Sequence, residues 1–130
     1  MLSLGANVRV YLCAEAVDLR RSFDGLSVLA QEVLAQDPLS GHLFVFHNRR
    51  GDKLKVLYYD GQRLCLWYKR LERGCFRIPP AEGEAVALDA RQLGLLLEGL
   101  DVTLAAQAPR RAIRAVAYTY TLNQWRALVE

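Results

Sequence analysis

The fold is decided by residues 42–79, which read HLFVFHNRRGDKLKVLYYDGQRLCLWYKRLERGCFRIP. Short runs rich in Val, Tyr, Phe and Trp alternate there with compact turn signals, a pattern typical of a β-meander. Asp60-Gly61 is the strongest turn signal, because a tight hairpin needs a positive φ that Gly adopts at low cost. The stretch therefore predicts four strands, in the runs 42–47, 53–59, 63–71 and 75–78.

The same stretch carries the basic charge of the chain. It holds 9 basic and 3 acidic residues, a formal charge of +6, whereas the other 8 basic and 11 acidic residues give −3. Such an asymmetry indicates an acidic partner, nucleic acid first, although exposed strands also carry Lys and Arg that prevent edge pairing. The candidate nucleic-acid-binding residues are Arg49, Arg50, Lys53, Lys55, Arg63, Lys69, Arg70, Arg73 and Arg77.

Length and composition favour a single globular domain. The chain has 130 residues, of which 52% are hydrophobic and 24% charged. It has no apolar run of the roughly 18 residues that a membrane span needs and no recognisable secretion signal, so we expect a cytoplasmic protein without a membrane partner. Cys13, Cys65 and Cys75 have no CxxC spacing, which favours buried reduced thiols over disulfides or zinc ligands.

The segment before the meander predicts one strand and one helix. Residues 8–13 alternate as a short strand does. Apolar residues then recur at helical spacing from Ser22, a suitable N-cap, to about residue 36. Pro38 cannot continue a helix, so we expect the helix to end before it.

The segment after the meander predicts a second helix. A short strand at 86–88 is followed by Asp89, and Gln92 stands three residues later at the spacing of a capping box. The helical period ends near Gly99. We therefore assign residues 1–101 to a single α+β domain and residues 102–130 to a partly ordered C-terminal extension.

Both faces of the predicted sheet carry apolar side chains, so both must be covered. The expected fold is α+β: a curled antiparallel β-meander of about five or six strands, with one helix packed on it and a second helix near the C-terminus. Strand alternation gives one face Leu57, Tyr59, Leu64, Leu66, Tyr68, Phe76 and Ile78, with Lys53, Lys55 and Arg70. The opposite face receives Leu54, Val56, Tyr58, Cys65, Trp67, Leu71 and Cys75, with Arg63, Lys69 and Arg77.

No constellation of residues predicts catalysis. His42 and His47 are an odd number of positions apart on one strand and face opposite sides, so they do not hold a metal together. The acidic residues that could suggest a metal-binding set each have a structural role in a turn or a helix; they are Asp18, Asp24, Asp52, Asp60, Glu72 and Glu98. None of the common nucleotide-binding or hydrolase motifs is present. We expect no catalytic residue, no metal and no cofactor. Aromatic residues between basic ones suit base stacking, but at strand spacing they are more often core.

Several blocks of the sequence resemble one family. VDLRRSFDGL at 17–26 is similar to the opening signature of the TnpB-type accessory proteins of bacterial insertion sequences of family sixty-six. The blocks DPLSGHLFVFHNRRGDKLKVLYYDG at 37–61, LCLWYKRLERGCFRIP at 64–79 and LDARQLGLLLEGLD at 88–101 follow in the same order as in that family. The resemblance implies a non-catalytic accessory role in DNA transposition, beside a separate and larger transposase. The tail after Asp101 departs from the family pattern.

Two functions stay open from the sequence. One is a nucleic-acid-binding module that contacts DNA backbone through a basic sheet, with Arg49 and Arg50 as the best candidates because turn side chains reach solvent. The other is a protein-interaction subunit that docks on the transposase, or on another protein of the element, without binding DNA itself. A homo-oligomer also stays open.

Overall fold

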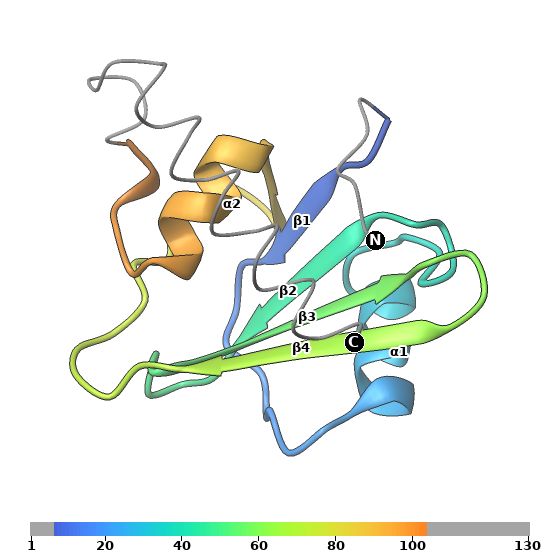
Figure 1. The fold of residues 1–130 in the computed structure, drawn as a ribbon, viewed down its shortest axis with the longest axis horizontal. Coiled ribbons are helices and arrows are strands. Elements are labelled where there is room, and N and C mark those ends of the chain that lie inside the picture. Colours follow the sequence, from blue (N-terminus) through green and yellow to red (C-terminus); the bar gives the residue numbers. More distant parts are fainter. Residues whose placement is uncertain (1–6, 104–130) are drawn as a thin grey trace.

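Five strands and two helices make up residues 7–103, which are the part of the chain that the structure, a computed structural model, describes (Figure 1). In chain order they are β1 (Val10–Cys13), α1 (Phe23–Glu32), β2 (Leu43–His47), β3 (Lys53–Tyr59), β4 (Leu64–Arg70), β5 (Ala85–Leu88) and α2 (Ala90–Leu97). The predicted α+β class is confirmed, and so are the strands near 8–13, 42–47, 53–59, 63–71 and 86–88.

The sheet is open and mixed, with the strand order β4-β3-β2-β1-β5. β2, β3 and β4 pair antiparallel as predicted, and Lys53 faces Arg70 at one end of the β3–β4 ribbon while Tyr59 faces Leu64 at the other. β1, however, runs parallel to β2, because α1 carries the chain back between them. The prediction of a curled, wholly antiparallel meander is therefore wrong: β4 and β5 form two separate edges.

Residues 75–78 are irregular, so the predicted fourth strand of the meander is wrong. Gly74 adopts a φ of +77° and interrupts the alternation that β4 begins. The segment then crosses to the β2–β3 turn, where the Phe76 N–H donates to the Gly51 carbonyl at 2.7 Å. As a result Phe76 is buried with Val56 and Trp67, on the face opposite to the one predicted.

Helix α1 ends at Glu32, four residues earlier than expected. The N–H groups of Leu34 and Gln36 reach back to the carbonyls of Leu29 and Ala30, so the last turn widens, and Ala35 takes a positive φ of 54°. This turn ends the helix before Pro38. The predicted N-cap Ser22 makes no side-chain capping bond; its carbonyl accepts from Leu26 instead.

Helix α2 begins with the predicted capping box. The Gln92 N–H donates to Asp89 Oδ1 at 2.8 Å, and the Asp89 N–H donates to Gln92 Oε1 at 3.0 Å. These reciprocal bonds satisfy two of the N–H groups that a helix start leaves without partners. Gly99, with a φ of +79°, follows the end of the helix.

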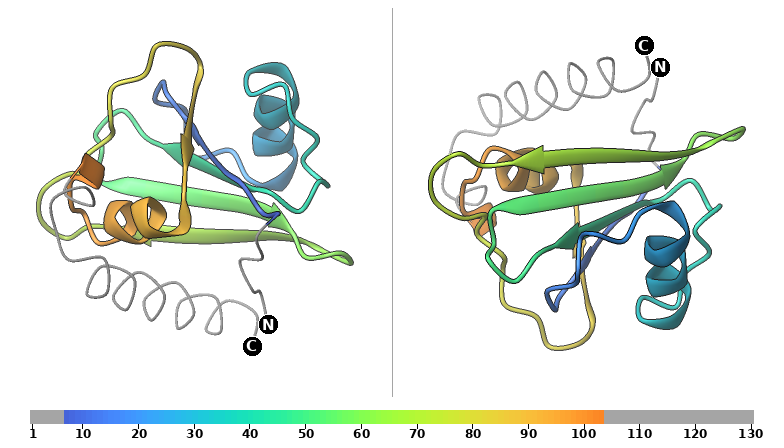
Figure 2. Two further views of the ribbon diagram at one scale, coloured as in Figure 1. Left: turned by 90° about the horizontal axis from the view of Figure 1, so that it is seen from above. Right: turned by 90° about the horizontal axis from the view of Figure 1, so that it is seen from below.

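Each helix covers one face of the sheet, which confirms that both faces are buried against something (Figure 2). On the α2 face the alternating residues Leu54, Val56 and Tyr58 of β3 pack with Trp67 and with Leu93 of α2. On the α1 face Leu57 packs with two phenylalanines of β2 and two residues of α1. That second cluster consists of Cys13, Leu19, Leu26, Ala30, Leu34, Phe44, Phe46 and Leu57.

The cysteines differ in burial. Cys13 is buried, as predicted, whereas Cys65 is half-buried and Cys75 is exposed, so the prediction of three buried thiols is wrong for Cys75. Neither helix within residues 7–103 is long and apolar enough to cross a membrane. Of the C-terminal extension only Val102 and Thr103 are described, and Val102 is buried in the α2-side cluster. The prediction of a partly ordered tail otherwise lies outside the described residues, and the boundary at residue 101 stays a prediction.

Candidate nucleic-acid interface

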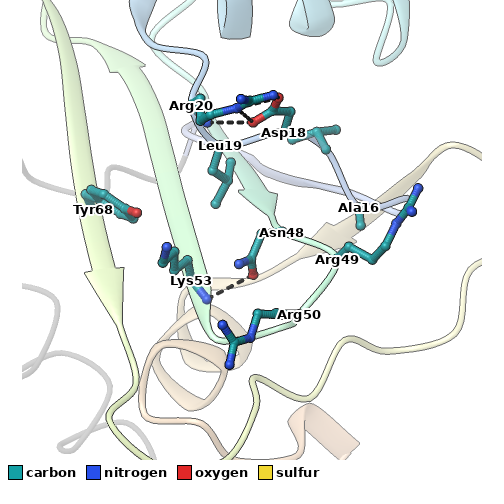
Figure 3. A pocket seen from close by; sticks show the side chains of 10 residues that line it. Ala16, Asp18, Leu19, Arg20, Asn48, Arg49, Arg50, Lys53 and Tyr68 are labelled. Carbon is teal, nitrogen blue, oxygen red and sulfur yellow. Dashed lines mark hydrogen bonds and ion pairs between the residues drawn. The ribbon is translucent and has the colours of Figure 1, made fainter.

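An open pocket of about 480 Å³ lies where three segments meet (Figure 3). The segment after β1 forms one wall, the β2–β3 turn forms the second, and a tyrosine of β4 completes it. The lining residues are Ala16, Val17, Asp18, Leu19, Arg20, Asn48, Arg49, Arg50, Lys53 and Tyr68. Four of these side chains are basic and one is acidic, which gives the pocket a net charge of +3. We call it the basic pocket.

The β2–β3 turn is held by Asn48. Its Oδ1 accepts from the Lys53 N–H at 3.1 Å, and its Nδ2 donates to Asp52 Oδ1 at 2.7 Å. The bond from Asn48 holds the pKa of Asp52 below its usual range. Because main-chain and side-chain bonds close the turn internally, Arg49 and Arg50 are left exposed at its tip.

The opposite wall is held by an ion pair between Asp18 and Arg20. Arg20 Nη2 donates to Asp18 Oδ2 at 2.6 Å, and its Nε donates to Oδ1 at 3.0 Å, so the contact is a two-point fork. These bonds lower the pKa of Asp18 to about 2. The Val17 N–H donates to the His47 carbonyl at 2.8 Å and fastens this wall to β2. The Arg20 side chain is 91% exposed, so its guanidinium faces solvent although the bonds to Asp18 fix its orientation.

The third wall is Tyr68, which is 51% exposed. Its direct cross-strand partner is Lys55, whose Nζ lies 4.8 Å from the centre of the tyrosine ring. Lys55 itself is only 7% exposed, and its ammonium donates to the Arg21 carbonyl at 2.8 Å. Burial lowers the pKa of Lys55. Lys55 therefore supports Tyr68 from within the fold. Its inclusion among the candidate DNA-contacting residues implied an exposed side chain, and the structure instead buries it.

The nine candidate basic residues do not share one face. Arg49, Arg50 and Lys53 meet at the basic pocket. Arg70 faces Lys53 across the strands and pairs with Glu72 at 3.1 Å. The remaining candidates lie elsewhere. Lys69 is on the α2 side, where its Nζ donates to the Leu97 carbonyl at 2.7 Å. Arg63 lies in the β3–β4 turn, and Arg73 and Arg77 are exposed after β4.

Sequence reasoning missed Arg20 and Asp18 as parts of this site. They lie about thirty positions before the β2–β3 turn and outside the basic stretch, so charge counting gave no reason to join them to Arg49. The parallel pairing of β1 with β2 brings them to the turn, because the chain leaving β1 then passes the end of β2. A signal was present in the Asp-x-Arg spacing at 18–20, which suits a local ion pair.

The histidines have packing roles, in line with the sequence interpretation. His47 is buried, and its Nε2 lies 3.0 Å from the Cys13 carbonyl oxygen. His42 accepts the Arg9 N–H at Nδ1. Among residues 7–103, no three His, Cys, Asp or Glu side chains gather as a metal site requires. This surface places four cationic side chains, of a kind that can pair with anions, beside an aromatic ring.

Comparison with known proteins identifies the family. The family described as "IS66 Orf2 like protein" matches residues 8–107. The chain is 50% identical over 101 residues to "Uncharacterized protein y4hO" of Sinorhizobium fredii. The aligned region covers 78% of this chain and 88% of the relative. The chain is 34% identical over 117 residues to "Uncharacterized protein y4jC" of the same organism, over 90% of this chain and 100% of the relative. No solved structure matches. The resemblance seen in the sequence is thus confirmed, and the chain belongs to the IS66 Orf2-like family, whose members are accessory proteins of IS66 transposition.

Proposed function

We propose that this protein is a non-catalytic accessory factor in the transposition of an insertion sequence, and that it contacts the DNA backbone through the basic pocket. Family membership supports the role in transposition. The observation that carries the DNA contact is the convergence of Arg20, Arg49, Arg50 and Lys53 around one pocket, from two segments far apart in the sequence. Other proteins of the same element act as its partners, in the cytoplasm.

The chemistry of the pocket suits phosphate. Guanidinium groups bind phosphate oxygens through two parallel N–H bonds, and three of the four cations here are arginines. Phosphate contacts fix position rather than sequence, so we expect weak sequence dependence. Four contacts to duplex DNA correspond to a slope of about −3.6 in a plot of log affinity against log salt concentration.

The test is a salt series of DNA affinities, measured by fluorescence anisotropy with the full chain. Replacing both Arg49 and Arg50 with Ala removes two phosphate contacts, so the slope should flatten by about 2 and the affinity should fall. The matched control is the double change Arg63→Ala and Arg77→Ala, which removes the same charge from exposed positions outside the pocket. Equal losses in both double variants would show that net charge, and not the pocket, sets the affinity.

We also expect no DNA cleavage or joining with magnesium or manganese. The acidic residues that come nearest to a metal set have other partners or positions: Asp18 is bonded to Arg20, Asp24 lies in the first turn of α1, and Glu98 follows α2. Metal-dependent cleavage that disappeared in Asp18→Asn, Asp24→Asn or Glu98→Gln would contradict this.

A second function, docking on the transposase, is favoured by one observation. Phe23 and Val28 of α1 are each 42% exposed, and apolar side chains of this size are anchors at protein interfaces. The docking function forecasts no DNA binding by the isolated chain and co-purification with the transposase, which Phe23→Ser with Val28→Ser should abolish. A homo-oligomer could pair through β4, which is an edge strand of the sheet within residues 7–103, and sedimentation of the isolated chain tests it.

A further inference from the structure

We infer that the basic pocket takes single-stranded DNA, with an unpaired base stacked on Tyr68. This inference rests on the proposed function, because it names the form of DNA that the same pocket receives. The observation that supports it is that the Tyr68 ring stays half exposed in the pocket wall, with four cationic side chains lining the same pocket.

Tyr68 is built as a platform. It stands on β4 next to the buried Trp67, and its Cα lies opposite Lys55 in the β3–β4 register. The Lys55 ammonium lies 4.8 Å from the ring centre and is itself fastened to the Arg21 carbonyl. The ring is thus supported from the protein side and still open to the pocket. Rings of this kind stack on the bases of single strands with little regard to sequence.

The size of the pocket separates single strands from duplexes. A volume of about 480 Å³ lies within the range of sites that enclose one small ligand, roughly 300–1,000 Å³. A base in a duplex has both faces covered by its neighbours, so it cannot reach a side chain in such a pocket unless it leaves the stack. An unpaired base does not have to leave a duplex stack before it enters the pocket. Duplex DNA can make only backbone contacts with the cations at the rim of the pocket.

The cationic side chains line a path along which a DNA backbone can pass the Tyr68 ring. Arg20 lies at one end of the pocket and Arg50 at the other, with Lys53 between them and Tyr68 to one side (Figure 3). Asp18, which also lines the pocket, accepts from Arg20 Nε and Nη2 and so fixes the orientation of its guanidinium. A strand whose base stacks on Tyr68 therefore has cations available for the phosphates on both sides of that nucleotide. RNA shares this chemistry, and the experiment separates it from DNA.

The experiment compares four probes with the full chain: a 20-nucleotide thymidine strand, the corresponding 20-base-pair duplex, a strand of equal length that lacks bases, and a uridine strand. We expect the thymidine strand to bind at least about fivefold more tightly than the duplex, which is the lower value for one stacked base, and no more weakly than the uridine strand. Loss of one stacked base weakens binding roughly fivefold to 150-fold, so Tyr68→Ala should show such a loss on thymidine and none on the baseless strand.

One control variant and two further measurements keep the result interpretable. Tyr68→Phe retains the ring and should retain the affinity, and Tyr68→Ala should keep the salt slope because it removes no charge. Ultraviolet cross-linking of an iodouracil-substituted strand should attach at Tyr68. An equal loss on the thymidine and baseless strands would overturn stacking, and tighter binding of the uridine strand would overturn the choice of DNA.

The failures of the inference and of the proposed function are distinguishable. Salt-dependent duplex binding that needs Arg49 and Arg50, without preference for single strands, would overturn the inference and leave the proposed function standing. Absence of binding to every probe would overturn both and favour docking on the transposase.

Discussion

The two faces of the sheet are made by alternate residues of the same strands, yet they differ in how fully a helix covers them. On the α2 face the cluster extends across β1, β2, β3 and β4, and even the basic Lys69 is bonded to a carbonyl of α2. On the α1 face the helix packs at the Leu57 end of the β3–β4 ribbon, and the Lys53 end is left to the basic pocket.

This difference separates stability from binding along a single strand. Trp67 and Tyr68 are neighbours on β4, but Trp67 points into the α2-side core and Tyr68 lines the basic pocket. Because the pocket takes only the Lys53 end of the α1 face, the rest of the sheet surface can hold the fold. The pocket should therefore tolerate substitutions that would unfold the protein at adjacent positions.

The largest effect should come from the core side of this pair. Trp67→Ala removes a buried aromatic side chain and should lower the free energy of unfolding by about 3–5 kcal/mol. Tyr68→Ala removes a half-exposed ring and one cation–π contact, and should cost about 1 kcal/mol. Urea denaturation gives both values. If Tyr68→Ala destabilised the fold as much as Trp67→Ala, the claim that stability and binding are separated between these two neighbours would be wrong.

A smaller effect should distinguish two lysines on the same face. Lys53 lines the basic pocket, whereas Lys55, two positions later, is buried and bonded to the Arg21 carbonyl. Lys53→Met should reduce the salt slope of DNA binding by about 0.7 to 0.9, the value of one phosphate contact. Lys55→Met should leave the slope unchanged. A reduced slope in Lys55→Met would show that Lys55 meets phosphate.

Asp18 gives an effect of opposite sign. Among residues 7–103 it is the one carboxylate that lines the basic pocket, so Asp18→Asn raises the net charge of that lining from +3 to +4. Affinity for DNA should increase, by about fivefold at most for one charge close to a phosphate in water. Glu82→Gln makes the same charge change in an exposed loop outside the pocket and should have little effect. Weaker binding by Asp18→Asn would mean that its orientation of Arg20 outweighs its charge.

The smallest effect is a titration. The pKa of Asp18 is about 2, below the ordinary value of 3.8, because Arg20 donates to the carboxylate. A lowered pKa in the folded state means that the pair contributes to stability above about pH 4, and that this contribution is lost as the pH falls towards 2. Carboxyl carbon NMR should record the low pKa, and Arg20→Ala should return it towards 3.8. An unchanged pKa in Arg20→Ala would exclude the ion pair as its cause.

Local signals in the sequence predicted the local structure. The Asp60-Gly61 turn, with Gly61 at a φ of +101°, and the Asp89–Gln92 capping box both form, because each depends on residues a few positions apart. The parallel pairing of β1 with β2 was missed, since it depends on a crossover that no short pattern records. The false strand at 75–78 arose because the alternation there resembles a strand, while Gly74 redirects the chain.

The candidate site was predicted in part for the same reason. Arg49 and Arg50 were singled out because turn residues reach solvent, and both are exposed at the basic pocket. The burial of Lys55 and the arrival of Arg20 depend on how the segment after β1 folds over the end of β2. Those contacts join residues thirty or more positions apart, and neither charge counting nor periodicity relates residues at that distance.

The central claim is that the open end of the α1 face is the DNA contact, and NMR shift mapping tests it most directly. Amide spectra of the full chain, recorded while a single strand is added, should change most at residues 16–20 and 48–53 and at Tyr68. Residues of the α2-side core, such as Leu93 and Leu96, should be unaffected. Changes centred on the Arg63 turn or on the exposed residues of α1, with none at the basic pocket, would contradict the claim.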